Sequence, residues 1–125
     1  MRLGENDPMS DYKIVDTQFE RAQYGVSLTQ IIHAPIKQPS GEVKTFILSA
    51  HISRGKSDKH GWSTGTVSAL DSDAENWGGI VSVGNEDVVR QVPSPKERSA
   101  DHRAALEAVA AGLFERAIRV LTVVD

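Results

Sequence analysis

Residues 94–125 read SPKERSADHRAALEAVAAGLFERAIRVLTVVD, and this stretch decides the fold. Ser94 and Glu97 form a capping-box pattern with Pro95 at the first helical position, so a helix is predicted to begin here. Apolar residues recur beyond it at helical spacing and would lie on one face of that helix. These residues are Leu106, Val109, Ala110, Leu113, Ala117, Val120, Leu121 and Val124. A helix with one apolar face needs a second layer to cover it.

The sequence leaves two alternatives for the end of this helix. Helical spacing continues almost to the last residue, but residues 118–124 are rich in β-branched side chains, which favour strands. Gly112 also weakens a helix by roughly 1 kcal/mol relative to alanine. We therefore expect a helix to about Arg116, followed over residues 118–124 either by further helix or by an extra C-terminal strand.

The chain before residue 94 is typical of β-hairpins. Residues 26–34 and 45–53 alternate between apolar and polar side chains, as strands with one buried face do. Gly41 lies between them, at the left-handed position of a three-residue loop. Such an odd-numbered loop pairs Leu28 with Ile52 and places both apolar sets on one face of the sheet.

Residues 62–70, 79–83 and 86–92 predict three further strands, and the Gly-Asn dipeptide between the last two is typical of a two-residue hairpin turn. Residues 12–15 favour a short first strand or a lead-in to a helical turn. Together these patterns predict an α+β fold. It consists of an antiparallel sheet of hairpins with about five strands, and one long C-terminal helix packs on one face.

The length of 125 residues is enough for one domain with a core of its own. Residues 1–10 carry glycine, proline and charges with almost no apolar side chain, so disorder is predicted there. Residues 11–125 are predicted to form a single α+β domain. Met9 is an alternative to Met1 as the natural start of the chain.

Composition narrows the class of protein. A hydrophobic content of 39% and a charged content of 25% are ordinary for a soluble globular protein. A net charge of -3 and a pI near 5.8 argue against an overall basic nucleic-acid binder but leave room for a local basic patch. Cysteine is absent, which excludes thiol catalysis and favours a reducing compartment. We expect a cytoplasmic protein with no membrane span and no cofactor.

The outward face of the predicted sheet is polar. In the register above, His33, His51 and Thr64 point away from the core, and His51 lies between Thr29 and Thr64. The other outward positions of the three strands are Ser27, Ile31, Thr45, Ile47, Ser49, Ser53, Trp62, Thr66 and Ser68. Hydroxyls and imidazoles supply donors and acceptors without net charge. This face is therefore predicted to recognise a polar ligand, the alternative being an ordinary solvated strand surface.

Residues 54–62, RGKSDKHGW, form the one concentrated basic segment of the sequence. Phosphate binding uses cationic side chains and accessible backbone amides, and an exposed aromatic ring stacks on bases. The predicted ligand-binding residues are therefore Arg54, Lys56, Lys59, His60 and Trp62 of this segment, together with His33, His51 and Thr64. The alternative is an exposed polar hairpin loop.

The order of several antiparallel strands followed by a helix resembles the Whirly type of domain. That resemblance implies binding of single-stranded DNA on the sheet. Our first hypothesis is a small soluble, non-enzymatic binding or adaptor module for single-stranded nucleic acid or a protein partner. The apolar residues 120–124 would also pair or pack across a homo-oligomer, because exposed apolar segments rarely stay uncovered.

The alternative hypothesis is enzymatic. A strand ending at Asp71, two hairpin strands, a helix carrying Glu107 and a last strand look like a truncated ribonuclease H-like arrangement, with Asp71-Ser72-Asp73 in place of that family's Asp-Gly-Ser. The resemblance implies a divalent-metal-dependent phosphodiester hydrolase in which Asp71, Asp73 and Glu107 hold metal ions that activate water. Apart from this alternative, no catalytic or metal-binding residue is predicted.

Overall fold

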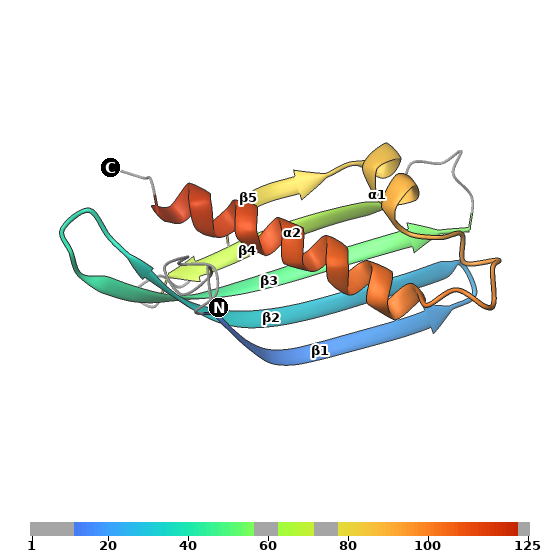
Figure 1. Cartoon of the computed structure of the whole chain (residues 1–125), viewed down its shortest axis with the longest axis horizontal. Helices are drawn as coiled ribbons and strands as arrows, with labels where there is room; N and C mark the ends of the chain where they lie inside the picture. Colours follow the sequence, from blue (N-terminus) through green and yellow to red (C-terminus); the bar gives the residue numbers. More distant parts are fainter. Residues whose placement is uncertain (1–11, 57–62, 72–77, 123–125) are drawn as a thin grey trace, which may run out of the picture.

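The structure of the protein, a computed structural model, describes residues 12–56, 63–71 and 78–122 (Figure 1). One antiparallel sheet contains β1 (Lys13–Ala22), β2 (Gly25–Lys37), β3 (Val43–Gly55), β4 (Thr64–Asp71) and β5 (Gly78–Val83), in that order across the sheet. Two helices follow, α1 (Asn85–Gln91) and α2 (His102–Thr122). α2 crosses one face of the sheet obliquely (Figure 1), so the predicted α+β fold is confirmed. The segment 1–10 and both alternative start residues lie outside the described residues.

The β2–β3 hairpin has the predicted register. Leu28 pairs with Ile52, and the loop closes where the Gln38 amide donates to the Glu42 carbonyl at 2.7 Å. Gly41 has a φ of +93°, a left-handed conformation that glycine adopts without steric cost. The apolar residues of both strands therefore share the face that α2 covers.

The core lies between that face and α2. Both layers contribute to its largest fully buried apolar side chains. These include Leu28, Ile32, Ile36, Leu48 and Ile52 on β2 and β3, and Leu106, Leu113, Phe114 and Ile118 on α2. Burying such a side chain stabilises the fold by about 1.5–3 kcal/mol.

The C-terminal alternatives are decided in favour of helix as far as Thr122. Ile118 is buried in the core, and the Thr122 hydroxyl donates to the Ile118 carbonyl at 2.7 Å. Burial of one helical face outweighs the strand preference of the β-branched residues, because most helical stability in proteins comes from such packing. Of the two alternatives left open for residues 118–124, further helix is therefore correct for residues 118–122, and the extra C-terminal strand is not.

The predicted start of α2 was also wrong. Residues 94–97 form a single turn in which the Glu97 amide donates to the Ser94 carbonyl at 2.9 Å. The helix begins at His102, and its first turn is capped by Asp101, whose carboxylate accepts from the Ala104 amide at 3.0 Å. Aspartate is a strong N-cap, whereas the capping-box pattern here closes only a local turn.

Residues 86–92 do not form a strand. Gly84 is the N-cap of α1, and the Val88 amide donates to the Gly84 carbonyl at 3.2 Å. Val88 and Val92, one helical turn apart, are both buried. The Gly-Asn dipeptide therefore starts a helix instead of a hairpin turn, because a helix buries both valines.

The fifth strand of the sheet is β1, and not residues 86–92. β1 is much longer than the predicted short strand at residues 12–15, and it excludes the alternative of a helical turn there. It begins beside Tyr12, whose ring lies 5.9 Å from that of Phe114 on α2, centroid to centroid. Burial, with a smaller effect of the Glu115 carboxylate, raises the pKa of Tyr12 above its ordinary value.

The β3–β4 register differs from the prediction by two residues. Thr64 pairs with Ser53 instead of His51, and Gly65 pairs with Ile52, so each residue keeps its predicted face but has different neighbours. At Gly65, a Cβ atom would lie 3.1 Å from Leu113 Cδ1 and from Val83 Cγ2, and 3.2 Å from Ile52 Cγ1. Glycine therefore allows α2 to approach the sheet closely here.

We expect Gly65→Val to lower the free energy of unfolding by about 1–3 kcal/mol, because the added methyl groups must displace three side chains of the core. Urea unfolding measures this change. Gly79→Val on β5 is the matched control, since no heavy atom lies within 4 Å of a Cβ placed there. Equal losses in the two variants would contradict the close approach of α2.

Candidate functional site

The face of the sheet opposite α2 is not covered by any element among the described residues (Figure 1). Its central strands are β2, β3 and β4. The register places these described residues on it: Ser27, Thr29, Ile31, His33, Pro35 and Lys37 of β2, Val43, Thr45, Ile47, Ser49, His51 and Ser53 of β3, and Thr64, Thr66, Ser68 and Leu70 of β4. We call this surface the open face.

His51 lies at the centre of the open face. It pairs with Thr29 on β2 and with Thr66 on β4, and its Nδ1 is 2.9 Å from the Thr29 hydroxyl. Thr64, predicted beside His51, pairs with Ser53 and donates its hydroxyl to the Val83 carbonyl at 3.0 Å. The hydroxyl nearest to His51 on the β4 side therefore belongs to Thr66.

The two histidines of the open face are not neighbours. His33 pairs with Ile47, whereas His51 pairs with Thr29. Four residues separate these positions along each strand, which corresponds to about 13 Å. Among the described residues, no group of three or more histidines and carboxylates could hold a metal ion.

The open face contains no carboxylate on the outward positions of β2, β3 or β4. The protein as a whole carries 17 acidic residues against 14 basic ones, so the acidic residues are distributed unevenly. On the sheet, β1 carries Asp16, which pairs with Ile31, and Glu20, which pairs with Ser27, and β4 ends at Asp71, which pairs with Phe46. A polyanion could therefore lie over the outward positions of β2–β4 without meeting a carboxylate at any of them.

Arg54, a predicted ligand-binding residue, has a structural role. It occupies an inward position of β3 and is only 3% exposed. Its Nε donates to the Val92 carbonyl at the end of α1 at 3.0 Å, and a terminal nitrogen donates to the Gly55 carbonyl at 2.7 Å. The guanidinium thus links the end of α1 to β3.

Lys56 is exposed at the end of β3, as predicted, whereas Lys59, His60 and Trp62 lie outside the described residues. Asp73 also lies outside the described residues. Only the backbone of Asp71 is described, and it pairs with Phe46.

Glu107, on the second turn of α2, is 3.7 Å from the Arg103 side chain. The order of elements that resembled a ribonuclease H-like fold is absent here, since α1 follows β5 and α2 extends to Thr122.

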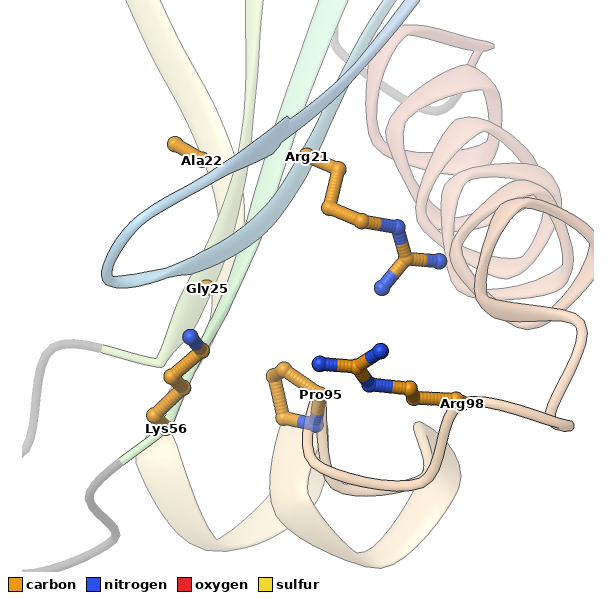
Figure 2. Close-up of a pocket in the computed structure, with 6 residues that line it drawn as sticks. All are labelled: Arg21, Ala22, Gly25, Lys56, Pro95 and Arg98. Atoms are coloured by element: carbon orange, nitrogen blue, oxygen red, sulfur yellow. The ribbon is translucent and has the colours of Figure 1, made fainter.

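A basic pocket that no sequence pattern predicted lies at the end of the sheet where the β1–β2 turn is found (Figure 2). We call it the cationic pocket. It is lined by Arg21, Ala22, Gly25, Lys56, Pro95 and Arg98. Its three cations come from β1, from the end of β3 and from the connection between α1 and α2. No local motif could have joined residues so far apart in sequence.

None of the protein-family models, curated proteins or solved structures with which we compared the chain matches it. Within the described residues, neither helix is long and apolar enough to cross a membrane.

We expect Arg54→Met to lower the free energy of unfolding by about 1–3 kcal/mol, because it leaves buried carbonyls without their donor. Lys56→Met, at an exposed position two residues away, should change it by less than about 0.5 kcal/mol. Urea unfolding of both variants tests the structural role. If the Arg54→Met protein is as stable as the wild type, this structural role of Arg54 is refuted.

Proposed function

We propose that the protein is a non-enzymatic binding module that binds single-stranded nucleic acid on its open face. The observation that carries this proposal is the absence of carboxylates from the outward positions of β2, β3 and β4, in a protein whose net charge is -3. Carboxylates repel phosphates. A surface that binds phosphates must therefore lack carboxylates locally, whatever the net charge of the protein.

The side chains of the open face suit a flexible, polar strand. Thr66, Ser68 and His51 offer hydroxyls and an imidazole to phosphate and sugar oxygens, which receive most protein–DNA hydrogen bonds. Ile47 and Leu70 pair with each other on the same face and form an apolar area against which bases can pack. The absence of cysteine supports a reducing, cytoplasmic location for this activity.

We expect wild-type protein to bind a fluorescently labelled oligodeoxythymidine at low salt, with affinity that falls gradually as salt rises, because Lys37 is the one lysine or arginine on the outward positions of β2, β3 and β4. Thr66→Glu places a carboxylate beside His51 and should weaken binding about tenfold, because like charges across an interface cost more than 1 kcal/mol. Fluorescence anisotropy measures both effects.

Ala108→Glu is the matched control, since it adds the same charge at an exposed position of α2, on the other layer. It should leave binding unchanged. Equal weakening by both substitutions would show a general charge effect and contradict the open face as the site. Absence of binding at low salt would sink the nucleic-acid proposal and direct the search to a protein partner.

We also propose that the protein forms a homodimer through the end of α2. Val120 is 42% exposed there, although it belongs to the apolar pattern of the helix. Packing against a second copy would cover it.

We expect Val120→Glu to convert a dimer to a monomer, as measured by light scattering during size-exclusion chromatography. Val43→Glu is the control, because Val43 is 58% exposed and belongs to the open face, on the side of the sheet opposite α2. A wild-type monomer at high concentration, or a dimer in both variants, would contradict this interface.

A further inference from the structure

The cationic pocket is chemically distinct from the open face. It has a volume of about 360 Å³ and lies between the β1–β2 turn, the end of β3 and the connection that leads to α2 (Figure 2). Its size falls at the lower end of the range for small-molecule sites in proteins, about 300–1,000 Å³. The pocket can therefore hold a small anion or the anionic end of a larger molecule.

Among the described residues, no carboxylate balances the positive charge of the pocket. Within the described residues, Arg21, Lys56 and Arg98 form no ion pair with a carboxylate, and no carboxylate lines the pocket. Asp101 belongs to the same connection as Arg98 but caps α2. Figure 2 shows the guanidinium groups of Arg21 and Arg98 pointing toward each other. Two like charges that face each other repel, and an anion between them would remove that repulsion.

Arg21 is held in place from two sides. Its guanidinium carbon lies 5.8 Å from the centre of the Phe19 ring, a cation–π distance, and Phe19 is two residues away on the same face of β1. A terminal nitrogen of the guanidinium is 3.0 Å from Nδ1 of His102. These contacts fix the side chain before any ligand arrives, which reduces the entropy lost on binding.

His102 can accept from Arg21 in only one protonation form. Its other ring nitrogen, Nε2, lies 2.8 Å from the Ser94 carbonyl, which can only accept, so Nε2 carries a proton. A guanidinium can only donate, so Nδ1 must present its lone pair to Arg21. The ring is 1% exposed and neutral in this arrangement. Arg21 therefore keeps its full charge and most of its N–H groups for a ligand.

We infer that the cationic pocket binds a phosphate group through Arg21, Lys56 and Arg98. A phosphate carries up to two negative charges and several acceptor oxygens, so two guanidiniums and an ammonium can bind it at once. A carboxylate has one charge and two oxygens and would leave part of this donor set unused. The inference does not depend on nucleic-acid binding by the open face.

The test is a nuclear magnetic resonance titration of the ¹⁵N-labelled full chain with inorganic phosphate at constant ionic strength. We expect saturable shifts of the Gly25, Lys56 and Arg98 amides. Arg98→Gln and Lys56→Gln should each weaken phosphate binding about tenfold, the effect of losing one charge-assisted hydrogen bond. Both side chains are exposed, so these variants should fold like the wild type.

Lys96→Gln is the matched control, because Lys96 is exposed in the same connection and does not line the pocket. It should bind phosphate like the wild type. The inference is overturned if the shifts do not saturate, if they lie elsewhere, or if Lys96→Gln weakens binding as much as Arg98→Gln does.

Further arms of the titration identify the source of the phosphate. If it belongs to a small molecule, a nucleoside 5′-monophosphate should bind and the matching nucleoside should not. If it belongs to a nucleic-acid end, an oligonucleotide should displace inorganic phosphate only when it carries a 5′-phosphate. Equal binding of a nucleoside with and without its phosphate would refute the assignment. Thr66→Glu should leave phosphate binding intact, which separates this test from that of the open face.

Discussion

The packing of the apolar face of α2 on the inner face of the sheet determines the rest of the structure. Side chains alternate along β2 and β3, so burying Leu28 and Ile52 under the helix necessarily turns Thr29 and His51 outward. A single helix covers only one face of a sheet. The other face is left to solvent or to a ligand, and its side chains can vary without affecting the core. The open face is therefore a consequence of the fold and also the part of it most available for binding.

His102 connects this packing to the cationic pocket. It is the first residue of α2, and its buried ring accepts from Arg21 of β1 and donates to the carbonyl of Ser94. The start of the helix, the edge of the sheet and the preceding connection are thus joined by one side chain. The Ser94 carbonyl fixes the His102 ring, and the ring in turn orients Arg21. The buried His102 and the pocket residue Arg21 therefore belong to one hydrogen-bond network.

Sequence patterns predicted the elements whose burial follows from local alternation, such as the pairing of Leu28 with Ile52. These patterns were misleading where contacts with residues far away in the sequence determine the local structure. Residues 86–92 have a strand-like composition, yet α1 extends to Gln91, and the carbonyl of its C-cap residue Val92 accepts from Arg54. Arg54 itself continues the inward alternation of β3, but its charge suggested exposure. Only the position of α1 over the end of β3 shows why a buried arginine is needed there, and that position is not visible in any local pattern.

A net charge of -3 does not argue against either proposed site, because electrostatic interactions in salt solution are local. At physiological ionic strength they are largely screened beyond about 8 Å. An anion in the cationic pocket would therefore interact mainly with Arg21, Lys56 and Arg98, and one on the open face with Lys37 and the uncharged side chains of β2–β4. Asp16 and Glu20 on β1 border the open face and would confine a polyanion to the central strands. The position of each charge, and not their sum, decides where this protein can bind an anion.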